Sequence, residues 1–188
     1  TARDHFEQAI HLAPDAPLGW LLLGTHDLRG GAYESAREAL LQAQSLAPDN
    51  PAPCLAIAEL KAQTGHYEEI STWTQATLER APEDAEIWKA VARFYLARNL
   101  IQEDQPVQAA QGAVQLAPND AEAHRLLGWA YMLNNDTARA LSALDEALRL
   151  NPQLGEAHYL RGLALRITGE NEAAQEAFVK ATDLGYRP

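Results

Sequence analysis

Histidines, acidic pairs and one cysteine are the side chains in this sequence that are suited to chemistry. His124 and His158 are 34 residues apart, and acidic residues occur in adjacent pairs such as Asp145–Glu146. Histidine and carboxylate side chains bind metals or exchange protons when they converge in one pocket. The sequence has no histidine pair with a carboxylate at metal spacing, no glycine-rich phosphate loop and no nucleophile motif. We therefore predict no enzyme, no metal site and no cofactor.

The composition narrows the class of partner. The chain has 188 residues, 47% of them hydrophobic, and a formal net charge of −11. This charge disfavours nucleic acid, which is bound through basic surfaces. No apolar run reaches the roughly 18 residues of a membrane span, so we expect no membrane insertion. The single cysteine, Cys54, excludes an internal disulfide and leaves the compartment open. Twelve arginines against three lysines favour a bacterial source, in the cytoplasm or alternatively the periplasm.

The sequence repeats itself with a period near 34 residues. One column of prolines comprises Pro14, Pro48, Pro82, Pro118 and Pro152. A column half-way between them comprises Gly31, Gly65, Asn99, Asn135 and Gly169. A column of small residues comprises Gly24, Ala58, Ala92, Gly128 and Gly162. Proline ends helices, and glycine and asparagine tolerate the left-handed conformation at helix ends. Each repeat therefore predicts two helices that are joined by a short turn and approach closely at the small residue.

Apolar residues three and four positions apart, in runs of about 12–15 residues, indicate that these helices are amphipathic. No stretch shows sustained strand-like alternation, so we predict an all-α chain. The columns of the clearest repeat are Leu127, Gly128, Tyr131, Ala140, Leu144, Ala147 and Pro152. With these columns, the sequence resembles the tetratricopeptide repeat family. The resemblance implies a right-handed superhelical solenoid of antiparallel helix pairs, about 11 helices in all.

The resemblance divides nearly the whole chain into repeats. Residues 1–16 match the second helix of a truncated repeat, and five full repeats follow at 17–50, 51–84, 85–120, 121–154 and 155–188. We expect them to form one continuous solenoid domain. The third repeat has two extra residues within 99–107, and Pro106 is expected in the first turn of the next helix. Because solenoids need covered ends, we expect a fragment of a longer protein, or ends that another chain covers.

Trp129 is a large apolar residue that the packing columns do not explain. His124, Leu127 and Tyr131 form the packing stripe of its helix, whereas Trp129 lies on the opposite stripe. In tetratricopeptide repeat proteins, that stripe lines the concave partner-binding groove. The resemblance therefore implies the partner-binding residues Lys89, Arg93, Arg125, Trp129, Met132, Tyr159, Leu163 and Arg166. Further groove positions are Leu96 and Ile167 and, in the first two repeats, Leu18, Leu21, Thr25, Leu28, Ala52, Leu55 and Glu59.

Arginine and aromatic residues dominate binding hot spots, and here they gather in an acidic chain. We therefore expect a non-catalytic interaction module within a larger scaffold or adaptor protein, which binds a peptide or partner segment with acidic and apolar residues. Alternatively, Trp129 fills the gap between neighbouring first helices while arginines pair with Glu122 and Glu156, or a segment of the same chain occupies the groove. The alternative functions are a structural spacer or self-assembly element that associates through its repeat ends, and a regulatory domain of a larger enzyme.

Overall fold

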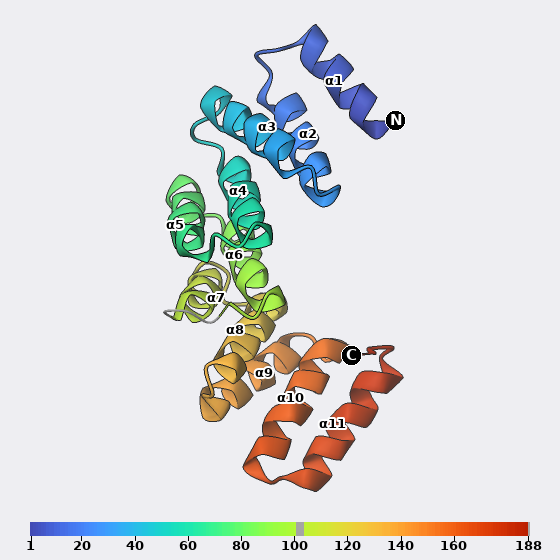
Figure 1. Cartoon of the computed structure of the whole chain (residues 1–188). Coiled ribbons are helices and arrows are strands. Elements are labelled where there is room, and N and C mark those ends of the chain that lie inside the picture. Colours follow the sequence, from blue (N-terminus) through green and yellow to red (C-terminus); the bar gives the residue numbers. More distant parts are fainter. Residues whose placement is uncertain (101–103, 188) are drawn as a thin grey trace. The chain divides into compact units, whose positions relative to one another are not determined.

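The computed structural model describes residues 1–100 and 104–187. These residues form eleven α-helices and one 3-10 turn and contain no strand, which confirms the predicted all-α class (Figure 1). No helix in the described ranges has both the length and the apolar character that a membrane crossing requires. The chain divides into two compact units, Thr1–Pro82 and Glu83–Pro188, which are described separately. That the repeats form one continuous domain stays a prediction.

The first unit contains helices α1 to α5. Their bounds are α1 (Ala2–Leu12), α2 (Pro17–Arg29), α3 (Tyr33–Leu46), α4 (Pro51–Gln63), the 3-10 turn η1 (Tyr67–Glu69) and α5 (Ile70–Arg80). Helices that follow one another from α1 to α5 pack together, and α2 also contacts α4. Helix α1 has no buried residue. It is tied to α2 by Arg3, whose guanidinium lies 2.6 Å from the buried carboxylate of Asp27.

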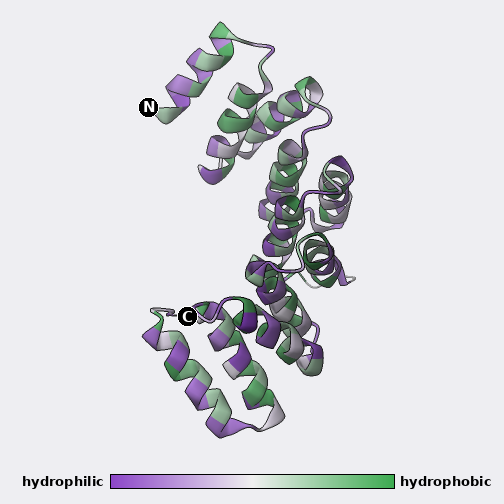
Figure 2. Ribbon diagram, turned by 180° about the vertical axis from the view of Figure 1, so that it is seen from behind, coloured by the Kyte–Doolittle hydropathy of each residue, from purple (hydrophilic) through white to green (hydrophobic). Residues whose placement is uncertain are grey.

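The second unit contains helices α6 to α11. Their bounds are α6 (Ala85–Ala97), α7 (Gln105–Leu116), α8 (Ala121–Leu133), α9 (Thr137–Leu150), α10 (Gly155–Thr168) and α11 (Asn171–Asp183). Helices α6, α8 and α10 each pack against the helix that follows, and α8 also contacts α6 and α10. The first helices of successive pairs are thus neighbours. Figure 2 shows that hydrophobic and hydrophilic residues are interspersed along each helix, as amphipathic helices require.

The turn and small-residue columns have the conformations that the sequence predicts. The backbone φ angle is positive at every member of the turn column, namely Gly31, Gly65, Asn99, Asn135 and Gly169. A Cβ atom added to Gly128 would lie 2.5 Å from Cγ of Leu144, so α8 and α9 are too close there for a side chain. Pro106 lies in the first turn of α7, as predicted. Residues 101–103, within the predicted insertion, lie outside the described residues.

Two leucines that were expected to line the groove are instead buried in the core. Leu28 packs with Ala36 of α3 and Leu60 of α4, and Leu96 is buried within α6. Both occupy the last turn of a first helix. For Leu28, the turn that follows carries α3 back across the leucine, so this position serves packing and not partner contact.

Candidate partner-binding surface

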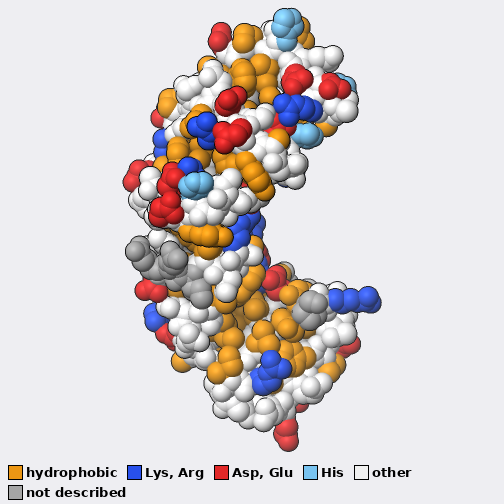
Figure 3. All heavy atoms as spheres, viewed as in Figure 1, with side chains coloured by type: hydrophobic (Ala, Val, Ile, Leu, Met, Phe, Trp, Pro, Cys, Tyr) orange, Lys and Arg blue, Asp and Glu red, His pale blue; other side chains and the backbone are white. Residues whose placement is uncertain are grey.

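The eight predicted site residues all lie on the first helices of the second unit, and we call them the inner stripe. Helix α6 carries Lys89 and Arg93, α8 carries Arg125, Trp129 and Met132, and α10 carries Tyr159, Leu163 and Arg166. Aspartate caps fix where two of these helices begin: Asp84 accepts a hydrogen bond from the amide of Glu86 at 2.9 Å, and Asp120 accepts one from the amide of Glu122 at 2.8 Å. Figure 3 shows hydrophobic side chains exposed over α8 to α10 on the face it presents.

Lys89 is buried and already paired with carboxylates. Its Nζ lies 2.7 Å from Glu86 of the same helix, and it also forms an ion pair with Asp120, which precedes α8. Burial opposes its charge, but the two carboxylates outweigh burial, so the pKa of Lys89 is raised above its ordinary value. Arg93 is more exposed and lies 3.8 Å from Glu86. Lys89 therefore links α6 to the start of α8, whereas Arg93 stays accessible.

Arg125 forms the same kind of link between α8 and α10. Its side chain is only 5% exposed, and Nε and Nη2 donate hydrogen bonds to the Glu122 carboxylate at 2.7 Å each. Its Nη1 lies 2.9 Å from Glu156 of α10, although the two groups are not aligned for a hydrogen bond. Burial opposes the positive charge, but the two glutamates outweigh it, so the pKa of Arg125 is raised. This is the arginine pairing that the sequence left open as an alternative.

Trp129 is half-buried and packs against a small core cluster between α8, α9 and α10. The buried members of this cluster are Leu144, Ala147, Ala157 and Leu160, and Leu163 also packs on it. The Arg125 guanidinium lies 5.8 Å from the centre of the Trp129 ring, within range of a cation–π contact. Trp129 thus does fill part of the space between neighbouring first helices, while part of its surface remains accessible.

The end of the inner stripe on α10 is more open. Arg166 is exposed, and its guanidinium lies 5.6 Å from the centre of the Phe178 ring on α11. Tyr159 packs on the same phenylalanine, with ring centres 5.6 Å apart. Ile167 is 65% exposed, and Met132 of α8 is half-buried. The structure therefore groups the predicted residues into two paired links, at Lys89 and Arg125, and an accessible end on α10.

His124 and His158 occupy the position that holds Trp20 and Trp88 in the first and third full repeats, and both have a packing role. Nε2 of His124 lies 2.9 Å from the carbonyl oxygen of Pro118, and Nε2 of His158 lies 3.0 Å from that of Pro152. Trp20 makes the equivalent bond, from Nε1 to the Pro14 carbonyl at 2.8 Å. Because a carbonyl oxygen only accepts hydrogen bonds, Nε2 of each histidine must carry the proton. Histidine thus replaces tryptophan as a ring N–H donor.

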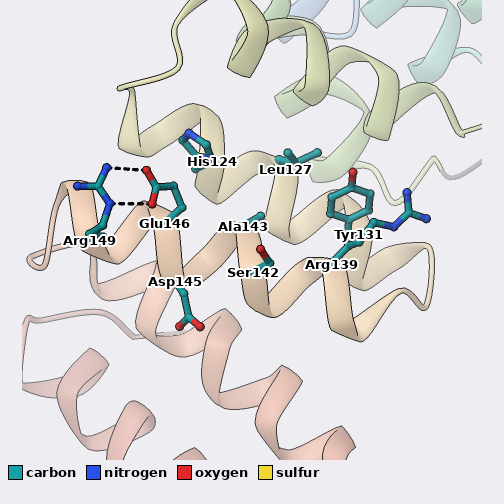
Figure 4. Close-up of a pocket in the computed structure, with 9 residues that line it drawn as sticks. All are labelled: His124, Leu127, Tyr131, Arg139, Ser142, Ala143, Asp145, Glu146 and Arg149. Carbon is teal, nitrogen blue, oxygen red and sulfur yellow. Dashed lines mark hydrogen bonds and ion pairs between the residues drawn. The ribbon is translucent and has the colours of Figure 1, made fainter.

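A concave surface, which the sequence did not indicate, lies on the other side of α8 from the inner stripe. This outer hollow has a volume of about 780 Å³ and is lined by His124, Leu127, Tyr131, Arg139, Ser142, Ala143, Asp145, Glu146 and Arg149 (Figure 4). Gln111 of α7 donates to the Tyr131 hydroxyl at 2.9 Å, and the Arg139 guanidinium lies 4.6 Å from the centre of the Tyr131 ring. The one sequence feature that could have pointed to this hollow is His124, which stands where other repeats have the larger tryptophan.

Comparison with known families agrees with the helix-pair architecture. Four family models, each described as a tetratricopeptide repeat, match residues 1–51, 29–94, 121–154 and 155–184. The chain is a tetratricopeptide repeat protein. A search of curated proteins found no significant match. Proteins of this family generally act as protein-interaction modules.

Solved tetratricopeptide repeat structures share the fold at low sequence identity. MamA from Desulfovibrio magneticus RS-1, from residue 41 to its end, is 22% identical with a TM-score of 0.69, over 90% of this chain and 94% of that chain. YrrB, described as a tetratricopeptide repeat protein with an unusual peptide-binding site, is 18% identical with a TM-score of 0.65, over 97% of this chain and 93% of that chain. At these identities the likeness shows the fold alone, a tetratricopeptide repeat solenoid.

Proposed function

We propose that this chain is a non-catalytic interaction module of a larger scaffold or adaptor protein, and that the inner stripe binds a segment of a partner protein. The observation that carries the proposal is the position of Trp129: it is half-buried against the cluster that contains Leu144 and Ala147, yet part of its ring remains accessible beside Arg125. A tryptophan held in this way supplies a large contact area at little cost in conformational entropy. The description of YrrB as a peptide-binding protein of the same fold is consistent with this role.

The residues of the inner stripe have different tasks under this proposal. Trp129, Met132 and Leu163 contact apolar side chains of the partner, and Arg93 and Arg166 receive its carboxylates, because these two arginines are the more exposed cations of the stripe. Lys89 and Arg125 mainly hold α6, α8 and α10 in place. Two charge-assisted contacts of about 1.5–3 kcal/mol each, with one aromatic anchor, suffice for roughly micromolar affinity.

Panning of a displayed random-peptide library against the whole chain tests the proposal. We expect enrichment of a motif with an apolar residue near one or two carboxylates, and loss of that motif in Trp129→Ala and in Arg166→Glu. Lys180→Glu is the matched control, because it reverses an exposed charge on α11, away from the inner stripe. If no enriched motif depends on both Trp129 and Arg166, or if folded wild-type protein enriches nothing, the proposal is contradicted.

The alternative function, a structural spacer or self-assembly element, draws support from exposed apolar residues on α1 and α11. Leu12 is 85% exposed and Val179 is 49% exposed. Sedimentation equilibrium over a range of protein concentrations separates the two functions. A mass that rises with concentration, and falls back to one chain in Leu12→Ser or Val179→Ser, favours self-assembly. A constant monomer mass favours partner binding.

A further inference from the structure

The outer hollow lies at a place where the fourth repeat differs from the third. In the third repeat the corresponding position holds Trp88, whose ring lies so close to Gly112 of α7 that an added Cβ there would be 2.1 Å from it. In the fourth repeat, His124 stands in place of this tryptophan and Glu146 in place of this glycine. The smaller ring leaves space over α9, and the volume of about 780 Å³ lies within the range of ligand-binding pockets, roughly 300–1,000 Å³.

The floor of the hollow is apolar, and each of its two ends carries an exposed arginine. Leu127 and Ala143 are buried beneath it, whereas Arg139 and Arg149 on the rim are 60% and 64% exposed. Each arginine pairs with a carboxylate three residues earlier, Arg139 with Asp136, which precedes α9, and Arg149 with Glu146 on α9, and these carboxylates are the less exposed partners. Asp145 also lines the hollow and is 57% exposed, but its carboxylate already pairs with Arg161 of α10 at 2.6 Å. Figure 4 shows the Arg149–Glu146 pair at one end of the hollow and Arg139 at the other. At each end of the hollow, the more exposed member of the ion pair is therefore the arginine.

These arginines can accept a second partner without breaking the fold. Exposed ion pairs within one helix contribute little to stability, so exchanging such a carboxylate for another costs little. Arg149 binds Glu146 through Nε and Nη2, and a guanidinium has a further edge for another acceptor. Between the two arginines lie the exposed hydroxyl of Ser142 and the ring of His124, whose Nδ1 is an acceptor when Nε2 donates to Pro118.

From this geometry we infer that the outer hollow is a second interaction surface, which takes an extended acidic segment of a partner protein. One apolar side chain of the segment lies in the hollow over Leu127 and Ala143, and two flanking carboxylates bind Arg139 and Arg149. The two arginines are ten residues apart on α9, which corresponds to about 15 Å. In an extended segment, the carboxylates are therefore about four or five residues apart. This surface is separate from the inner stripe, which lies on the opposite side of α8.

His124→Trp is the decisive variant, because the chain itself uses tryptophan in this column. Trp20 donates to the Pro14 carbonyl as His124 does to the Pro118 carbonyl, so the substitution keeps the packing bond while its larger ring fills the hollow. The double variant Arg139→Gln/Arg149→Gln removes the cations without adding bulk. Trp129→Ala is the control on the inner stripe, and circular dichroism with urea unfolding verifies that each variant is folded.

The test pans a displayed random-peptide library against the whole chain and measures each enriched peptide by fluorescence anisotropy. We expect a motif with an apolar residue between two carboxylates, whose affinity falls roughly tenfold or more in both hollow variants, because charge-assisted contacts carry the binding. Its affinity for Trp129→Ala should be unchanged, which separates this motif from any that the inner stripe binds. If no such motif is enriched, or if folded His124→Trp binds it normally, the inference is overturned. A monomer–dimer equilibrium that is lost only in the hollow variants also overturns it, because the occupant is then a second copy of this chain.

Discussion

The two sides of helix α8 hold their positive charges in opposite ways. On the inner stripe, Arg125 is 5% exposed and lies against two carboxylates, one of which comes from the next first helix. Beside the outer hollow, Arg149 is 64% exposed and pairs with Glu146 of its own helix. Both are arginine–glutamate contacts at hydrogen-bonding distance, but only the first connects separate repeats.

Burial, and not the presence of an ion pair, therefore decides what each arginine does. Removing one member of a buried pair leaves a charge without a partner in a poorly solvated site, which is costly. Removing one member of an exposed pair returns the other to water, which costs little. We conclude that Lys89 and Arg125 mainly support the fold, whereas Arg93, Arg139, Arg149 and Arg166 are exposed enough for a partner to reach.

The same substitution on the two sides of α8 should have very different effects, and the larger one is at Arg125. Arg125→Gln leaves Glu122 and Glu156 facing each other without a cation. Because both glutamates keep some solvent contact, we expect a loss of about 2–3 kcal/mol in the free energy of unfolding, somewhat below the roughly 3–5 kcal/mol for breaking a fully buried pair. Urea unfolding measures the loss, and adding Glu156→Gln should restore part of it. A loss below about 1 kcal/mol would mean that Arg125 does not link the helices.

We expect an effect of intermediate size when acid protonates the carboxylates of the buried ion pairs, because the free energy of unfolding should then fall. Burial alone would raise the pKa of Asp120, but Lys89 outweighs burial and lowers it below its ordinary value. Ser35, His26 and Arg3 do the same for the buried carboxyl of Asp27. A depressed folded pKa means that the unfolded chain takes up protons first as pH falls. Stability should therefore hold above about pH 5, fall from near pH 4, and stop falling once pH passes the folded pKa values.

Asp120→Asn is the matched variant for this acid dependence. Asparagine keeps the helix cap but cannot titrate, so the stability of the variant should fall less steeply than that of the wild type below pH 4. Urea unfolding at a series of pH values gives both curves. Parallel curves for the two proteins would show that the Lys89–Asp120 pair contributes nothing to the acid dependence.

The smallest effect is expected at the outer hollow. Arg149→Gln removes an exposed cation that pairs only within α9, so the melting temperature should stay within roughly 2 °C of the wild-type value. Differential scanning calorimetry of Arg149→Gln beside Arg125→Gln makes the comparison direct. Equal shifts in the two variants would remove the distinction between supporting and accessible arginines.

The repeat columns predicted much of the fold, because each reflects a local backbone requirement. Gly31 and Asn135 do adopt positive φ, and Gly128 does bring α8 against α9. Side-chain pairing was harder to predict, because it depends on the register between helices of different repeats. The sequence could therefore only pose the Arg125–Glu156 contact as an alternative, and it placed Leu28 at the groove although α3 and α4 cover it.

The sequence did not predict the outer hollow, for a different reason. A packing column specifies which face of a helix is covered but not how completely the side chains fill the space. In the third repeat the Trp88 ring lies against Gly112, whereas His124 and Glu146 stand at these positions in the fourth repeat, beside the hollow. The effect of these two residues on the surface can be seen only when the packing of α8 against α9 is known.

The most direct test of partner binding at the inner stripe is the NMR signal of the Trp129 indole N–H. The chain has four tryptophans, and Trp129→Phe identifies this signal by its disappearance. When an enriched peptide that Arg166→Glu fails to bind is titrated in, we predict that the Trp129 signal shifts and saturates with the same affinity as the binding curve, while the Trp20 signal stays in place. If the peptide saturates the protein and the Trp129 signal does not move, the inner stripe is not where the partner binds.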